Sequence, residues 1–281
     1  MQKKLIALLS GVLSLGAVGA ASAADMAVKA RPVAPAPVVV PAWAGFYIGG
    51  NIGYAWSEAD ANTNVLLTGN YLGFCGAACG VAVGNAASPQ LNPDAFVGGV
   101  QAGYNWQAGT WLFGLEADIN SYRNRTSSTV TQAYPGFPAI LYTSTTNVAT
   151  DWLFTGRARA GVVTGPALLY VTGGVALTDF RYAHAFADNQ AGFFATEAAQ
   201  ISDTRVGWTV GAGVEAMFGG NWSVKAEYLY VDFGRSSVVG TLTTANPAFG
   251  NDTFNHSVNL RSHIARVGLN YHFNSPVVAK Y

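Results

Sequence analysis

The chain has 281 residues, of which 50% are hydrophobic and 11% are charged, and its formal net charge at pH 7 is +0. Soluble domains carry about 25% charged residues, so this chain is poor in charge. Its balanced charge gives no electrostatic reason to expect a nucleic-acid partner. The 33 glycines, 13 tyrosines, 15 phenylalanines and 7 tryptophans favour strands and turns over helices.

The N-terminal segment has the three parts of a secretory signal peptide. Lys3 and Lys4 form a short positive region, residues 5–18 are apolar, and residues 21–23 read Ala-Ser-Ala. This order predicts a signal peptide over residues 1–23 and a mature chain that begins at Ala24. The short apolar stretch argues against the alternative, an N-terminal membrane anchor.

Export also bears on the two cysteines, Cys75 and Cys79, which lie in one glycine-rich segment. An oxidising compartment favours a local disulfide between them, and two free thiols are the alternative. Two ligands are too few for a structural zinc site, which needs four.

Residues 24–44 contain four of the prolines and predict an extended, Pro-rich periplasmic linker. After it, apolar and polar residues alternate with period two in eight separate runs. Each run is long enough for a tilted strand to cross a bilayer, whereas no mature segment approaches the ~20 apolar residues of a membrane helix. The runs are 45–57, 95–107, 110–122, 151–163, 167–178, 205–218, 221–232 and 258–273.

The connections between these runs alternate in length. Short glycine-rich turns lie at 107–110, 163–167 and 219–221. Between them are four long polar segments, which are predicted to be loops. Short turns on one side and long loops on the other are typical of an outer-membrane barrel. The long segments are 58–94, 123–150, 179–204 and 233–257.

Period two does not say which face points outward, because a soluble eight-stranded barrel can enclose its apolar face. Here the aromatic residues of the apolar face gather at both ends of the runs, as in the two interfacial belts of a membrane barrel. Near the tight turns are Phe46, Trp106, Trp111, Phe218, Trp222 and Phe273; near the long segments are Trp56, Phe96, Trp152, Trp208 and Tyr230.

The polar face carries charges of both signs near mid-strand, on neighbouring runs. Facing lipid, an Arg or Lys at the bilayer midplane costs about 2–4 kcal/mol, and Asp or Glu somewhat less. Eight such groups would cost about as much as a whole folding free energy of ~5–15 kcal/mol, so we expect them to pair inside the barrel. The predicted lumen cluster is Glu116, Asp118, Arg157, Arg159, Glu215, Lys225, Glu227 and Arg266.

The last run ends with a glycine, Gly268, followed by two aromatic residues that are two positions apart, Tyr271 and Phe273. This ending resembles the C-terminal insertion signal of bacterial outer-membrane barrels, which their assembly machinery reads. Residues 274–281 follow Phe273 and are predicted to be a C-terminal tail.

Four segments resemble the porin-like surface-antigen family of alphaproteobacterial outer membranes, relatives of the opacity-type and OmpA-type barrels. They are 43–51 (WAGFYIGGN), 98–106 (GGVQAGYNW), 227–234 (EYLYVDFG) and 276–281 (PVVAKY), so the resemblance covers residues 43–281. It implies an abundant envelope protein with structural and surface-exposed roles; some relatives are described as porins or haem binders.

Signatures of other functions are weak. Residues 211–216 fit a dinucleotide-binding pattern, but they lie within a predicted strand and no helix follows. His184, His256, His263 and His272 are scattered without metal-ligand spacing, which predicts no metal site and no cofactor; His184 and His256 fall in different predicted loops. A nucleophile, base and acid do not occur together, which predicts no enzyme.

The sequence therefore predicts an all-β, eight-stranded antiparallel up-and-down transmembrane β-barrel over residues 45–273, in the bacterial outer membrane. Its expected role is structural and surface-interacting, with a largely plugged lumen, because eight strands leave an interior just filled by side chains. Its expected partners are outer-membrane lipid, the barrel-assembly machinery, and host or envelope ligands bound by the loops. A narrow porin-like channel for small solutes and a haem- or host-ligand-binding surface protein are the alternatives.

Overall fold

The computed structural model describes residues 39–40, 43–246, 248, 250–273 and 277–278. The predicted signal peptide (1–23) lies outside the described residues, as do most of the predicted linker (24–44) and tail (274–281). Two described residues of that linker, β1 (Val39–Val40), pair with two of the tail, β11 (Val277–Val278).

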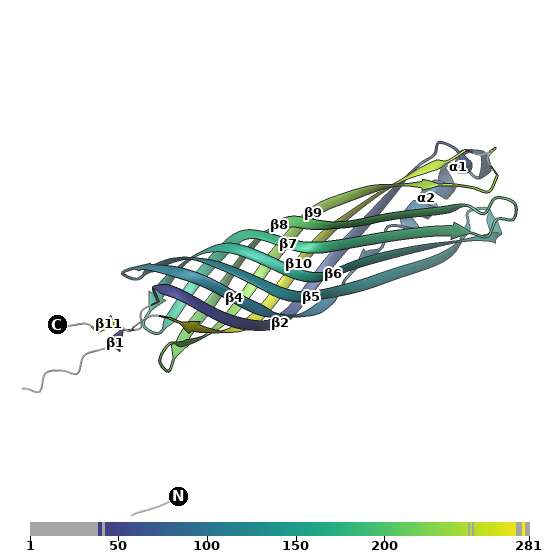
Figure 1. Cartoon of the computed structure of the whole chain (residues 1–281). Helices are drawn as coiled ribbons and strands as arrows, with labels where there is room; N and C mark the ends of the chain where they lie inside the picture. The colour runs from purple at the N-terminus through teal and green to yellow at the C-terminus, as the bar shows by residue number, and fades with distance from the viewer. Residues whose placement is uncertain (1–38, 41–42, 247, 249, 274–276, 279–281) are drawn as a thin grey trace, which may run out of the picture. The chain divides into compact units, whose positions relative to one another are not determined.

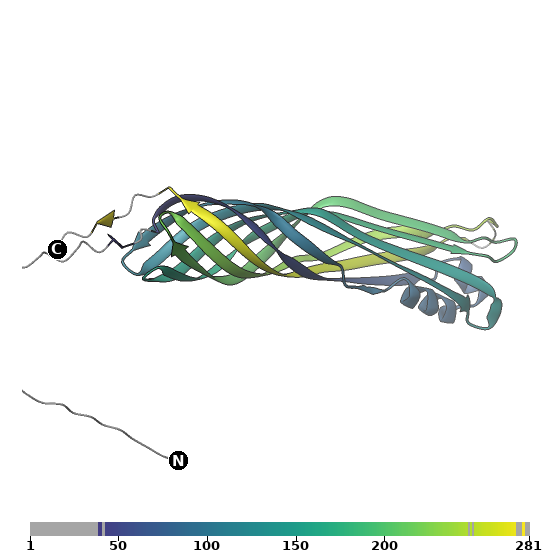
Figure 2. The same ribbon diagram turned by 90° about the horizontal axis from the view of Figure 1, so that it is seen from below.

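Eight long antiparallel strands form one closed barrel, which confirms the predicted fold class. Each strand pairs with the next along the chain, and the last pairs with the first, so the ring closes (Figures 1 and 2). The strands are β2 (Gly45–Leu66), β4 (Asp94–Ala108), β5 (Trp111–Tyr134), β6 (Phe137–Thr164), β7 (Ala167–Asp188), β8 (Thr196–Phe218), β9 (Trp222–Leu242) and β10 (Asp252–His272). A short strand, β3 (Gln90–Leu91), adds to β2 beyond the start of β4.

Tight turns join the strands at one end of the barrel, here called the turn end. Gly109, Gly165 and Gly219 take positive φ angles of 63°, 62° and 56° in the turns β4–β5, β6–β7 and β8–β9. A side chain would be strained in this conformation, which explains the glycines. All three turns lie where the sequence predicts them.

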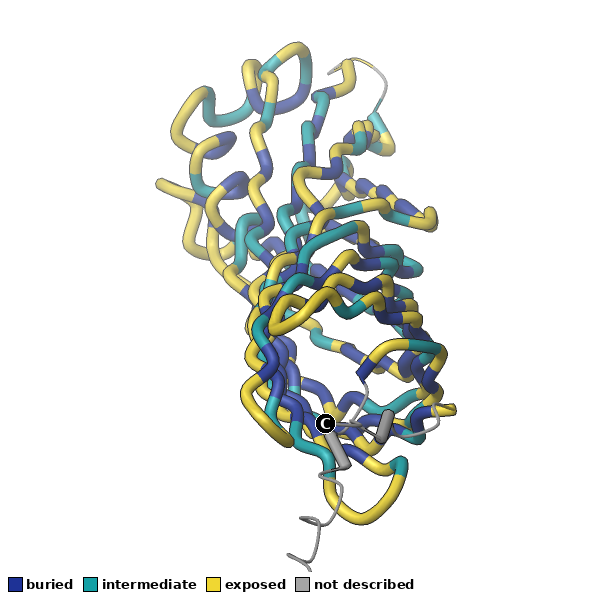
Figure 3. Tube along the Cα trace, turned by 90° about the vertical axis from the view of Figure 1, so that its left-hand side faces the viewer, coloured by how far each residue is buried: buried dark blue, intermediate teal, exposed yellow. Residues whose placement is uncertain are grey.

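In the part of the barrel next to the tight turns, the apolar face of the strands points outward, and Figure 3 shows the alternation of buried and exposed residues along the chain. Phe46 and Trp56 are exposed at opposite ends of this face on β2, ten residues apart. At about 3.3 Å per residue and a tilt of about 40°, ten residues rise about 25 Å, the height of the apolar band of an outer-membrane barrel. Among the described residues, no helix is both long and apolar enough to span a bilayer.

The strands are much longer than predicted, and much of each predicted long loop is strand. β6 alone has 28 residues. The sequence analysis predicted loops because these segments are polar. A strand that lies outside the bilayer can have a polar outer side, so polarity did not exclude strands here. Threonine, which favours strands, lines both partners, and Thr129 and Thr131 contact Thr145 and Thr143 across the β5–β6 pair. We call this part the extension: 58–66, 123–134, 137–150, 179–188, 196–204, 233–242 and 252–257.

Two helices lie at the far end of the extension, here called the helix end (Figure 1): α1 (Asn70–Phe74) and α2 (Ala77–Ala86). Cys75 and Cys79 form a disulfide that joins the two. The buried carboxylate of Asp252 on β10 accepts hydrogen bonds from the backbone N–H groups of Thr68, Gly69 and Tyr71, each at 2.8 Å. The bond from Tyr71 satisfies a donor that the first turn of a helix leaves unpaired, and all three bonds attach the start of α1 to the barrel.

Candidate functional site

The inside of the barrel is filled in layers, which β10 crosses in order. Every second residue of β10 is buried and points into the lumen. From the turn end, polar and charged residues come first, then a mostly apolar stretch, then a second polar and aromatic group. In order they are His272, Asn270, Gly268 and Arg266; Ile264, Ser262, Leu260 and Val258; and His256, Phe254 and Asp252.

The charged layer contains all eight residues of the predicted lumen cluster. Each is at most 5% exposed. Four are carboxylates and four are cations, so the formal charge of the cluster is zero. The members come from β5, β6, β8, β9 and β10, and the structure brings them into one continuous network of ion pairs.

Arg157 lies at the centre of this network. Its guanidinium donates to Glu116, to Asp118 at 2.8 Å and to Glu227 at 3.0 Å, while Nε donates to Thr155 Oγ1 at 2.9 Å. Four of the five N–H groups of the guanidinium therefore donate hydrogen bonds, three to carboxylates and one to a hydroxyl. This arrangement matches the rigid fork of a guanidinium, which a lysine does not reproduce.

Two further cations complete the pairing of the same carboxylates. Arg266 contacts Asp118 at 3.1 Å and Glu227 at 2.6 Å. Lys225 Nζ lies 2.8 Å from both carboxylate oxygens of Glu116. Each of these three acids therefore meets at least two cations, as buried charges require.

Arg159 occupies the side of the network nearer the turn end. It pairs with Glu215 at 3.1 Å and donates to Asn105 Oδ1 at 2.9 Å. Its guanidinium carbon lies 4.7 Å from the ring centre of Tyr47 and 5.3 Å from that of Tyr170, so it is held between two aromatic faces. The two tyrosine hydroxyls in turn donate to Glu116 and Glu227.

Glycines make room for these long side chains. In the strand register Gly53 lies across from Arg266 and Gly213 lies across from Glu227. A Cβ at Gly53 would lie 2.6 Å from the Cβ of Arg266, and one at Gly213 would lie 2.6 Å from the hydroxyl of Tyr170. The absence of a side chain there is a packing requirement of the filled lumen.

An apolar layer follows toward the helix end. Tyr122, Leu153, Phe180, Leu229 and Ile264 pack there from different strands, each at most 2% exposed. The layer ends at Tyr182 and Val258, beside which the second polar group begins.

The four histidines have three different environments. His184 and His256 were predicted to lie in loops, but the structure places them on β7 and β10. Their side chains point inward and meet. His272 lies 3.4 Å from Glu215 at the turn end. His263 lies on the outer face, where its ring nitrogen is 2.6 Å from the hydroxyl of Tyr228.

The residues of the predicted insertion signal close the barrel at the turn end. Tyr271 packs against Trp222 on β9, and Phe273 packs against Phe46 on β2, with ring centres 5.1 and 5.7 Å apart. Gly268 is buried beside Lys225 in the lumen. The signal residues therefore join the last strand to both of its neighbours.

The closed ring of eight strands, the exposed apolar band and its two aromatic belts define a transmembrane β-barrel. A sequence model of the outer membrane protein beta-barrel domain matches residues 10–273, and the chain belongs to that family. It is an outer-membrane protein of the alphaproteobacterial surface-antigen type.

Two curated relatives support this placement. The chain is 33% identical over 264 residues to the 31 kDa outer-membrane immunogenic protein of Brucella melitensis, covering 90% of this chain and 93% of that one. It is 32% identical over 138 residues to the 22 kDa outer membrane protein of Rhizobium leguminosarum, covering 49% and 53%. Among solved structures, the outer membrane protease OmpT of Escherichia coli is similar with a TM-score of 0.46 and 9% identity, covering 82% of this chain and 97% of that chain.

Proposed function

We propose that this protein is a closed outer-membrane barrel that anchors the extension and its helices outside the cell for contact with other molecules. The observation that carries the proposal is the filled lumen. Eight strands leave an interior about as wide as the side chains that fill it. Here the ion-pair network and the apolar layer occupy successive levels of that interior.

The charge balance of the network supports a closed lumen. A conducting path would need water to replace contacts between groups that are at most 5% exposed. It would also cross the apolar layer formed around Tyr122, Leu153 and Phe180. Both steps separate well-packed groups, so we infer that the lumen is a plug rather than a pore.

We expect the purified chain to produce no reproducible conductance steps in planar bilayers. A wide porin added to the same bilayers provides the positive control. Steps that appear with the wild-type chain, and whose size changes when Arg157 is replaced by methionine, would show a narrow channel and contradict the plug.

The second part of the proposal concerns which end faces outward. Outer-membrane barrels have short periplasmic turns and longer outer connections. The long connections between β2 and β4 and between β9 and β10 lie at the helix end, so this end would be outside. The relatives in Brucella are named outer-membrane immunogenic proteins, and an exposed extension is the part of such a barrel that antibodies reach. The polar outer side of the extension supports the same orientation.

A short peptide epitope inserted at Gly136, in the turn between β5 and β6 at the helix end, is expected to bind antibody on intact cells. The same epitope inserted at Gly109, in the turn between β4 and β5, is the matched control. We expect it to bind only after the cells are permeabilised. Labelling of Gly109 but not Gly136 on intact cells would reverse the proposed orientation.

A further inference from the structure

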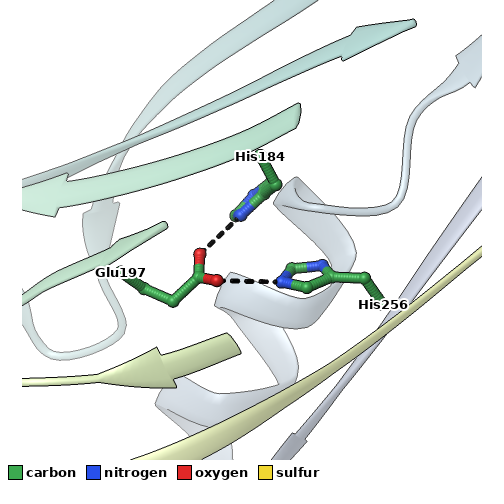
Figure 4. A group of neighbouring side chains, drawn as sticks. All are labelled: His184, Glu197 and His256. Atoms are coloured by element: carbon green, nitrogen blue, oxygen red, sulfur yellow. Dashed lines mark hydrogen bonds and ion pairs between the residues drawn. The ribbon is translucent and has the colours of Figure 1, made fainter. Parts of the chain in front are cut away.

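Three chemistry-bearing side chains meet inside the extension: His184 on β7, Glu197 on β8 and His256 on β10 (Figure 4). They are 2%, 4% and 1% exposed. Nδ1 of His184 lies 2.7 Å from Oε2 of Glu197, and Nε2 of His256 lies 3.2 Å from Oε1. The three ligand atoms all lie within 4.8 Å of one another.

The other nitrogen of each histidine ring is held by a hydroxyl. Nε2 of His184 lies 2.9 Å from Ser144 Oγ, and Nδ1 of His256 lies 2.8 Å from Thr63 Oγ1. Outer hydrogen bonds of this kind orient the rings of metal-binding histidines and select the nitrogen that faces the ion.

The bond to Thr63 selects the ring form of His256. Thr63 Oγ1 donates its hydrogen to the carbonyl oxygen of Ala87. It therefore accepts from Nδ1, which must carry a proton. A neutral imidazole has one N–H, so Nε2 then presents a lone pair to the carboxylate of Glu197. Two acceptors face each other there unless a cation, either a proton or a metal ion, lies between them.

The backbone of β9 packs closely against the carboxylate of Glu197. Gly240 on β9 lies against the carboxylate, and a Cβ at that position would collide with Oε1. The side chain of His256 is itself only 1% exposed, so the three groups are enclosed within the extension.

We propose that His184, Glu197 and His256 bind a divalent transition-metal ion, with Zn²⁺ as the best-fitting case. Two imidazole nitrogens and one carboxylate are a donor set that zinc uses when it keeps a further position open for water or another ligand. Imidazole suits zinc, copper and nickel. Calcium and magnesium take six or more oxygen ligands, or keep several waters, and are poorly matched to this set.

The test uses the full mature chain, folded in detergent and without a polyhistidine tag, after chelator treatment. Titration calorimetry with Zn²⁺ is expected to show one saturable site per chain that Mg²⁺ and Ca²⁺ do not occupy. Co²⁺ is expected to fill the same site and to give the visible absorption of a low-coordinate ion.

Variants separate this site from other zinc binding. Removing an outer hydrogen bond by Thr63→Val is expected to weaken zinc by about 10- to 100-fold, and His184→Ala, His256→Ala and Glu197→Gln by more than that. Gly240→Ala is expected to weaken binding by displacing the carboxylate. His263→Ala, on the outer face, is the matched control and should leave affinity unchanged. Faster gel migration of the unboiled protein identifies variants that still fold.

The absence of saturable zinc binding by the wild-type chain would overturn the proposal, and a shared proton would then explain the three contacts. Zinc affinity that stays unchanged in a folded His184→Ala/His256→Ala variant, or that falls equally in His263→Ala, would overturn it as well. A loss confined to the three ligands, Thr63 and Gly240 supports it. These outcomes do not depend on whether the lumen conducts.

Discussion

Replacing Arg157 with methionine is expected to lower the free energy of unfolding by about 3–5 kcal/mol, the usual cost of removing one partner from a buried ion pair. Methionine keeps much of the volume but leaves the cluster with four carboxylates and three cations. Asp118 and Glu227 each lose a donor within 3.0 Å. Urea titration of the protein in lipid vesicles, followed by gel migration of unboiled samples, measures the loss.

Two controls separate charge balance from packing. In the double variant Arg157→Met/Asp118→Asn, three carboxylates and three cations remain, in the pairs Glu116–Lys225, Glu227–Arg266 and Glu215–Arg159. We expect this variant to regain part of the lost stability. Arg181→Met removes an arginine whose side chain is 44% exposed and which pairs with Asp151 and Asp179. Water screens such pairs, so a small effect is expected. Equal losses in Arg157→Met and Arg181→Met would contradict our account.

Replacing Trp43 with alanine is expected to cost about 3–5 kcal/mol, the range for truncating a buried tryptophan. Trp43 is fully buried and packs at the turn end with Leu112, Val163, Leu168 and Tyr170. Its carbonyl also accepts a hydrogen bond from Asn105 at 3.0 Å. The neighbouring strands fix the width of the barrel, so the cavity left by the ring collapses only in part. The same urea titration measures the change.

Trp111→Ala is the matched control for this prediction. Trp111 lies at the same end of the barrel but is 57% exposed on the outer face. Lipid fills the space that its ring leaves, so no cavity forms and a smaller loss is expected. Trp43→Phe should recover part of the stability lost in Trp43→Ala. If Trp43→Ala proves no more damaging than Trp111→Ala, the buried role of Trp43 is wrong.

Trp43 shows a contact that the sequence did not reveal, although β2 begins at Gly45 as predicted. The sequence placed it at the end of the Pro-rich linker, because the alternation begins only at residue 45. In the structure its ring lies 5.6 Å from that of His272, so it belongs to the packed interior. A single aromatic residue before a strand is not part of any alternating pattern. Neither periodicity nor composition therefore indicates that it is buried.

The histidines show a second limit of sequence reasoning. His184 and His256 are 72 residues apart, and neither lies near Glu197 in a motif spacing. They meet because β7 pairs with β8 and because the ring of strands closes around them. The polarity of their segments predicted loops, and in loops no register would exist to bring them together.

The sequence by itself determined the class of this protein, the number of its strands and the direction of each face. Those features follow from period-two alternation and from the high cost of charge in lipid, which are both local properties. Only the tertiary structure decided which inward residues meet: the partners of Arg157, the layers along the lumen and the His184–Glu197–His256 group. These contacts depend on strand register and on the closure of the barrel, because side chains that face one another across the lumen come from strands far apart in the chain.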